Sequence, residues 1–131
     1  MVERIILLTV FFILAGLFSF RHRITRKNLN IQLPKKFNNL NSLPTVMYFW
    51  TNQCVQCKSS QKPALKNLQD KYAKFNLVSI DALTEKELVS KFKIRTVPST
   101  VIFAADGKSR FINNGFIDEK ELSTQIHASI N

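Results

Sequence analysis

The hydrophobic positions divide the chain into two parts. Residues 5–20 form an apolar run of sixteen residues without a charge, whereas later apolar residues recur in short runs or at helical spacing. Because the run is apolar on every face, we do not expect it to be buried inside the globular domain. We therefore assign residues 1–23 to an N-terminal anchor, 24–43 to a polar tether and the start of the fold, and 44–131 to the folded domain.

Within the domain, β-branched and aromatic runs alternate with stretches whose apolar residues repeat every three or four positions, which predicts strands separated by helices. The expected strands are 46–50, 77–81, 99–104 and 110–113, and the expected helices are 55–74, a short one after Thr84, and one after Asp118. Thr84 and Asp118 each precede a Glu by three residues, which is a capping-box signature. Residues 105–107 are a hairpin signal. The order predicts an α/β fold with a mixed sheet, to which Ile31 and Leu33 could add a short edge strand.

The apolar run predicts a single-pass transmembrane helix. As a helix it would extend roughly 24 Å at about 1.5 Å per residue, against a hydrocarbon core of about 30 Å. Bilayer thinning or snorkelling of Arg4 and Arg21 would cover the difference. A cleaved signal peptide is the alternative, but no small-x-small cleavage site follows the run, where residues 18–21 are Phe-Ser-Phe-Arg.

Charges beside the run bear on the orientation of this anchor. Arg21, Arg23, Arg26 and Lys27 follow the run, whereas Arg4 and the amino terminus precede it. Positive flanks tend to stay in the cytoplasm, so the charges favour a domain that faces the cytoplasm. An extracytoplasmic domain is the alternative, because an N-terminal anchor often leads its domain outward.

The composition excludes several classes of protein. The chain has 131 residues, 45% of them hydrophobic, and can bury the core of one domain, while its two cysteines are too few for a scaffold held by several disulfides. The formal net charge of +10 would suit nucleic-acid binding. The lysines are scattered, however, and no nucleic-acid-binding motif accompanies them. We expect a solvated basic surface and no nucleic-acid partner.

Both cysteines lie at one place in the predicted fold. Cys54 lies in the turn between the strand 46–50 and the following helix, and Cys57 lies one helical turn further on. The N–H groups and partial positive charge of a helix N-terminus stabilise a thiolate, and Lys58 adds a positive charge. This placement predicts a redox pair, with Cys54 as the attacking sulfur and Cys57 as the shielded, resolving thiol.

Two other interpretations of the cysteines are weaker. A zinc site needs about four ligands, but the chain has no second cysteine pair, and His22 and His127 lie near opposite ends of the sequence. Two inert buried thiols would suit scattered cysteines better than two at one helix start. We therefore expect no metal and, because the cysteines themselves carry two electrons, no cofactor.

From about Thr45 to Ile130 the chain resembles the thioredoxin superfamily. The ordered matches are YFW (48–50), the CVQC active site with its following lysine (54–58), PALKNL (63–68), VSID (78–81), FKIRTVPSTVIF (92–103), DGK (106–108) and GFIDEKEL (115–122). A CxxC at a strand–helix turn, followed about forty residues later by TVPST, is a specific combination. The resemblance implies a thioredoxin-like fold and an oxidoreductase that exchanges disulfides with protein substrates.

The resemblance also implies a substrate-binding region and partners. Pro98 should be cis and lie beside the cysteines, and the backbone of Val97 should pair with an extended substrate peptide by strand addition. A trans proline in a simple turn is the alternative. Trp50 should pack under the active-site loop. The partners would be protein thiols or disulfides near the membrane and a recycling reductase or oxidase.

The active-site sequence departs from that of common thioredoxins in ways that would tune the redox potential and the direction of electron flow. Gln53 replaces the Trp before the first cysteine, and Val55 and Gln56 replace Gly-Pro. Tyr48 occupies the position of a buried Asp in many thioredoxins. Solvent, the substrate or Lys58 would then have to deprotonate the resolving cysteine.

Pro63 lies six residues after Cys57, one more than in common thioredoxins, so we expect the helix to kink differently. Two other functions remain possible on this fold. One is an adaptor or assembly factor at the membrane with little redox turnover. The other is a metal carrier, which would require a further ligand near the cysteines.

Overall fold

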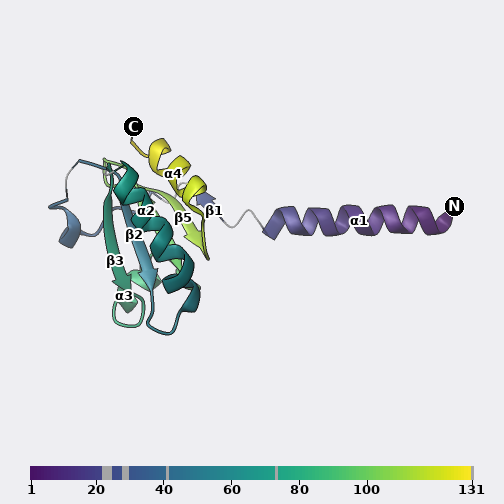
Figure 1. Cartoon of the computed structure of the whole chain (residues 1–131), viewed down its shortest axis with the longest axis horizontal. Coiled ribbons are helices and arrows are strands. Elements are labelled where there is room, and N and C mark those ends of the chain that lie inside the picture. Colours follow the sequence, from purple (N-terminus) through teal and green to yellow (C-terminus); the bar gives the residue numbers. More distant parts are fainter. Residues whose placement is uncertain (22–24, 28–29, 41, 73, 131) are drawn as a thin grey trace.

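The computed structural model describes residues 1–21, 25–27, 30–40, 42–72 and 74–130 (Figure 1). Its elements are α1 (Val2–Arg21), β1 (Thr25–Lys27), η1 (Lys35–Phe37), β2 (Thr45–Trp50), η2 (Cys57–Gln61), α2 (Lys62–Tyr72), β3 (Asn76–Asp81), α3 (Lys86–Lys91), β4 (Ser99–Phe103), β5 (Ser109–Asn114) and α4 (Glu119–Ala128). From β2 onward, strands and helices follow in the order that the sequence predicts. His22 and Arg23, which entered the sequence predictions, lie outside the described residues.

The strands form one mixed sheet in the order β1-β5-β4-β2-β3. Strands β2 and β3 are parallel, and the other neighbouring pairs are antiparallel. The predicted α/β fold with a mixed sheet is therefore confirmed. The hairpin between β4 and β5 is closed by Gly107, whose N–H donates to the Ala104 carbonyl at 2.9 Å and whose φ of +80° suits glycine.

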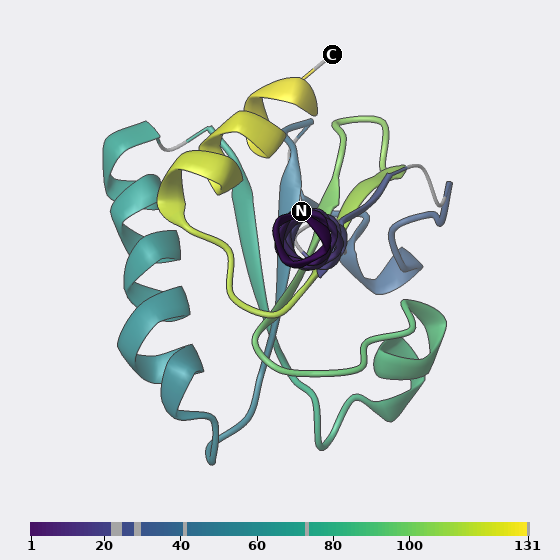
Figure 2. The ribbon, with the colours of Figure 1, turned by 90° about the vertical axis from the view of Figure 1, so that its right-hand side faces the viewer.

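Helices cover both faces of the sheet, with α2 and α4 on one side and α3 on the other (Figure 2). Strand β2 lies between them, and its side chains alternate between the two faces. Val46 and Tyr48 pack into the cluster under α2 and α4, while Met47 and Phe49 pack into the cluster under α3. All four are buried, so β2 gives rigid support to the loop that follows it, residues 51–54, which we call the active-site loop.

The segment before β2 joins this domain. Strand β1 pairs with β5, and Gln32 forms an isolated antiparallel bridge to Lys108 where we expected an edge strand. Ile31 and Leu33 are half-buried against the cluster under α3. This segment thus contributes both backbone pairing and apolar contacts to the domain.

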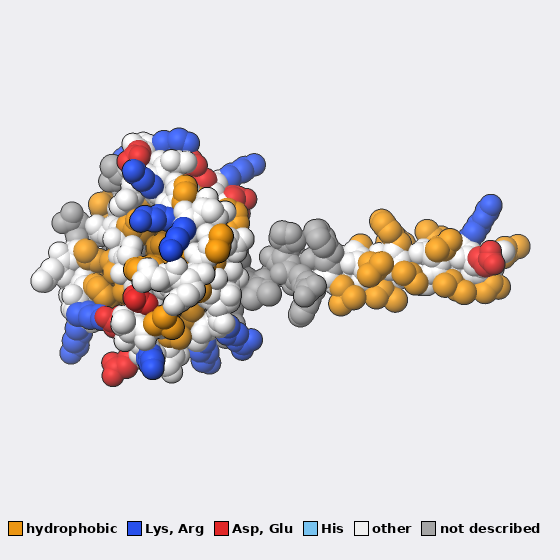
Figure 3. Space-filling model, turned by 60° about the horizontal axis from the view of Figure 1, so that its bottom comes forward, with side chains coloured by type: hydrophobic (Ala, Val, Ile, Leu, Met, Phe, Trp, Pro, Cys, Tyr) orange, Lys and Arg blue, Asp and Glu red, His pale blue; other side chains and the backbone are white. Residues whose placement is uncertain are grey.

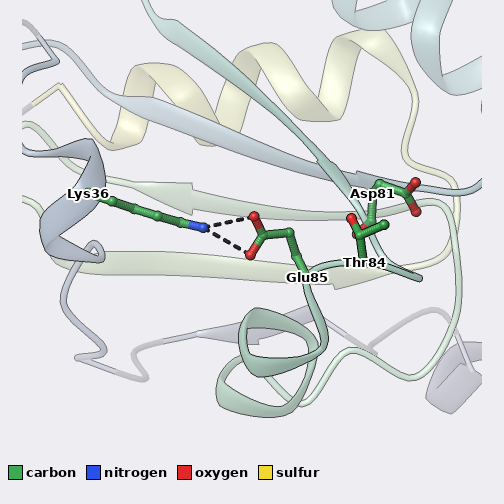
Figure 4. Close-up of polar contacts among 4 residues, drawn as sticks. All are labelled: Lys36, Asp81, Thr84 and Glu85. Carbon is green, nitrogen blue, oxygen red and sulfur yellow. Dashed lines mark hydrogen bonds and ion pairs between the residues drawn. The ribbon is translucent and has the colours of Figure 1, made fainter.

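The capping box predicted at Thr84 and Glu87 is wrong. None of the described side chains caps α3, whose N-cap residue is Glu85. Asp81 closes a turn here instead: its Oδ1 accepts the Leu83 N–H at 2.9 Å, and its carbonyl accepts the Thr84 hydroxyl at 3.3 Å. Figure 4 shows the side chains of Asp81 and Thr84 next to each other. This local turn competes with the cap.

Two polar contacts near the helix starts complete the fold. Glu85, the N-cap residue of α3, accepts both of its hydrogen bonds from Lys36 at 2.9 Å (Figure 4), which ties the η1 segment to α3. The cap predicted at Asp118 is present, with its side chain accepting the Glu121 N–H at 2.8 Å.

Helix α1 carries the N-terminal apolar run. Its described side chains are exposed, and Figure 3 shows hydrophobic side chains along the helix with one acidic and one basic side chain near its start. Among the described residues, no helix has the length and apolar character needed to cross a membrane. The transmembrane helix expected at residues 5–20 is thus not found.

Candidate active site

The two cysteines lie where the sequence places them, at the end of β2 and the start of the next helix. They form a disulfide with a Cα–Cα distance of 5.3 Å. Helical backbone begins at Val55, and the Lys58 N–H donates to the Cys54 carbonyl at 3.4 Å. The bend between β2 and α2 that carries the pair lies at the lower end of the domain in Figure 1.

The pair is asymmetric in burial and in hydrogen bonding. Cys57 is 2% exposed, whereas Cys54 is half-buried. The Cys57 N–H donates to the Cys54 sulfur at 3.1 Å. In the reduced protein, this N–H and the helix N-terminus would stabilise a thiolate at Cys54, because both place positive charge against its sulfur.

The helix after the pair begins with a π turn, η2. The Lys62 N–H donates to the Cys57 carbonyl five residues earlier, and a π turn has the effect of one inserted residue in an α-helix. Pro63 follows at once and has no N–H to donate to the Ser59 carbonyl. The π turn thus lies between Cys57 and Pro63, where the sequence has its extra residue.

Tyr48 contacts the resolving cysteine directly. Its side chain is buried, and its hydroxyl donates to the Cys57 carbonyl at 3.1 Å. Burial raises the pKa of Tyr48 to about 12, so the phenol stays neutral near pH 7. Where the sequence indicated only a missing acid, the structure thus shows a neutral donor that holds the carbonyl in the π turn.

We expect Tyr48→Phe to lower the free energy of unfolding by about 1 kcal/mol at pH 8, the typical net value of one hydrogen bond. The difference from wild type should shrink as the pH rises. Because burial raises the pKa of Tyr48 from 10.0 to about 12, the unfolded chain ionises first. The contribution of the neutral Tyr48 phenol to the stability of the fold is complete below pH 10 and is lost between pH 10 and 12.

Urea unfolding at pH 8, 10 and 11.5 measures this effect. Tyr72→Phe is the matched control, because Tyr72 is 46% exposed and surface substitutions usually change stability by less than about 0.5 kcal/mol. A Tyr48→Phe deficit that stayed constant up to pH 11.5 would contradict the assigned cause.

Gln61 is a structural residue of this site that sequence reasoning missed. Its side chain is fully buried, its Nε2 donates to the Ile117 carbonyl at 3.1 Å, and its Oε1 accepts the Ile117 N–H at 3.0 Å. The two bonds join the active-site helix to the loop before α4. Gln61 follows Cys57 by four residues, and this spacing was the only sign in the sequence that the two share a buried face of the helix.

The Val97–Pro98 peptide bond is cis, and Pro98 is buried. Phe49 pairs with Ser99 across β2 and β4, so Pro98 and the loop that carries the cysteines lie at the same edge of the sheet. Val97 is half-buried, and among the described residues its N–H has no hydrogen-bond partner.

The remaining predicted site residues differ in their burial. Trp50 is half-buried against the cluster under α2 and α4. Gln53, Val55, Gln56 and Lys58 are exposed around the pair, with Val55 reaching 76% exposure. Within the part of the chain that the structure describes, no group of three or more His, Cys, Asp or Glu side chains could hold a metal ion.

A cysteine pair at a strand–helix turn on this fold supports a thiol–disulfide redox function. The thioredoxin family model matches residues 24–128, and the chain belongs to the thioredoxin family.

Solved structures of thioredoxins have the same fold. Thioredoxin-2 of the malaria parasite, described as a component of its protein secretion machinery, shares 22% identity over 79% of this chain and 99% of that chain, with a TM-score of 0.63. Fasciola hepatica thioredoxin shares 21% identity over 72% and 88%, with a TM-score of 0.63. A mutant thioredoxin from Halobacterium salinarum shares 25% identity over 70% and 77%, with a TM-score of 0.62.

Proposed function

We propose that this protein exchanges disulfides with protein substrates through Cys54 and Cys57. The Cys54 thiolate attacks a substrate disulfide and forms a mixed disulfide, and the departing substrate sulfur takes up a proton. Cys57 then loses its proton and attacks the Cys54 sulfur, which releases the second substrate thiol. The substrate gains two electrons, and the pair becomes the disulfide. A separate reductase or oxidase would restore the starting state.

The hydrogen bond from the Cys57 N–H to the Cys54 sulfur carries this proposal. It stabilises the thiolate on the more exposed of the two cysteines, which is the sulfur that a substrate can reach. Tyr48 remains neutral at the other side of the pair, so it does not act as the base for Cys57. Solvent, or the second substrate sulfur as it leaves Cys54, takes that proton instead.

The same proposal gives the region around Pro98 a role in substrate binding. The substrate backbone would pair with Val97, whose N–H has no partner among the described residues, as an added strand. Trp50 would support the loop beneath the reacting sulfurs. The exposed side chains of Gln53, Val55, Gln56 and Lys58 would then tune the redox potential.

Reduction of insulin disulfides by the full chain in detergent, with dithiothreitol as reductant, tests this function. We expect wild type to raise the rate well above the dithiothreitol background and Cys54→Ser to return it to background. If wild type also stayed at background, the protein would instead be an adaptor that holds its partner without turnover.

We further propose that residues 5–20 attach the domain to a membrane, with the domain facing the cytoplasm. The run exposes large apolar side chains to solvent, among them Leu7 at 70% and Phe12 at 70%, which a membrane would cover. The chain should sediment with membranes and be released by detergent, not by alkaline carbonate.

A membrane-impermeant maleimide applied to intact, reduced cells tests the orientation, because Cys54 and Cys57 are the only thiols. We expect labelling only after permeabilisation. Labelling of intact cells would place the domain on the outer side.

A further inference from the structure

A groove runs along α2 and opens beside the resolving cysteine. It has a volume of about 590 Å³ and is bounded by the active-site loop, by α2 and by β3, which is an edge strand of the sheet. Buried Tyr48 and Leu65 line it together with half-buried Trp50 and Leu77. Because Cys57 also lines it, a chain in this groove would lie next to the resolving cysteine.

Three lysines that line this groove repeat every four residues. Lys58, Lys62 and Lys66 are all exposed and lie on one side of the helix. None of them forms an ion pair with another described residue, whereas Lys71 on the same helix pairs with Glu119 at 2.6 Å. Asp70 is the one acidic residue among the groove residues, so the lining carries a positive excess.

This arrangement disfavours the isolated helix. Like charges four residues apart destabilise a helix, and the row contains two such pairs. The lysines are too exposed to contribute to the core. A bound partner with negative charge would remove the repulsion and would be attracted over several ångströms.

We propose that this groove binds an acidic segment of the substrate protein adjoining the substrate disulfide. Acidic side chains would pair with Lys58, Lys62 and Lys66, and apolar side chains between them would cover Trp50 and Leu77. This inference rests on the proposed disulfide exchange and names the class of substrate for it. The groove lies beside Cys57, so the acidic segment would follow the substrate disulfide along α2.

Two disulfide-bonded peptides of equal length test the inference, one with three Glu flanking the disulfide and one with three Gln. We expect wild type to reduce the Glu peptide with a kcat/KM about tenfold higher at low salt, which corresponds to about 1.4 kcal/mol. Salt at 0.5 M should remove most of this preference, because it screens exposed charges.

Lys62→Glu with Lys66→Glu should abolish or invert the preference while retaining reduction of the Gln peptide. Lys86→Glu with Lys120→Glu is the matched control, because it changes the net charge equally at exposed positions on α3 and α4. The control should keep the preference for the Glu peptide.

Equal rates for both peptides on wild type would overturn the inference, as would an equal loss of preference in the control. The inference would also be overturned if Lys62→Glu with Lys66→Glu kept the preference for the Glu peptide but no longer bound vesicles of anionic phospholipid. The lysines would then bind a lipid surface. Failure to reduce either peptide would instead overturn the disulfide exchange, and this inference with it.

Discussion

Cys57→Ser should convert the protein into a trap that holds its substrate. The Cys54 thiolate would still attack a substrate disulfide, but no second thiol would resolve the mixed disulfide, so turnover should be abolished. The Cys57 backbone N–H that contacts the Cys54 sulfur at 3.1 Å remains in this variant, and the attack should continue. Non-reducing electrophoresis and mass spectrometry of membranes from expressing cells would detect the adducts.

The matched control is Cys54→Ser, which leaves only the buried Cys57. We expect few or no adducts from it, because its one thiol is 2% exposed. Equal trapping by both variants would contradict the assignment of roles. Adducts that persist in dithiothreitol would show that the linkage is not a disulfide.

Gln61→Leu should lower the free energy of unfolding by about 2–6 kcal/mol. The substitution keeps the side-chain volume but leaves the N–H and carbonyl of Ile117 without their partners, and each unsatisfied buried group costs about 1–3 kcal/mol. Because Gln61 lies in the π turn that follows Cys57, the active-site helix should loosen as well. Urea unfolding at neutral pH, followed by tryptophan fluorescence of Trp50, would measure both effects.

Gln32→Leu provides the comparison for this substitution. Gln32 is exposed, and surface substitutions of this kind usually change stability by less than about 0.5 kcal/mol. If the two variants were equally stable, the double hydrogen bond to Ile117 would have no energetic importance, and the link between the helix and the loop would have to be abandoned.

The sequence was sufficient for the elements whose signal is local. Strand β2 is a continuous apolar run, and the helix after it repeats apolar residues such as Leu65 and Leu68 at helical spacing, so both were predicted within a few residues. The cap at Asp118 was also predicted. At Thr84 the same kind of signal failed, because the Asp81 turn takes up the Thr84 hydroxyl.

The contacts that shape the site depend on tertiary structure and could not be predicted. Tyr48 and Cys57 are nine residues apart, and Gln61 and Ile117 are 56 residues apart. No periodic pattern links residues at such separations. The position of Pro63 predicted a changed helix kink, whereas the backbone shows a π turn at Cys57–Gln61.

A single-turnover experiment tests the central claim most directly. The fully reduced full chain is mixed in detergent with an equimolar amount of oxidised insulin, quenched with acid over time, alkylated and weighed by mass spectrometry. We predict that Cys54 and Cys57 become protected together from alkylation while insulin gains two thiols for each chain oxidised. If both cysteines stayed fully alkylated and insulin gained no thiols, the pair would not exchange disulfides with a protein substrate.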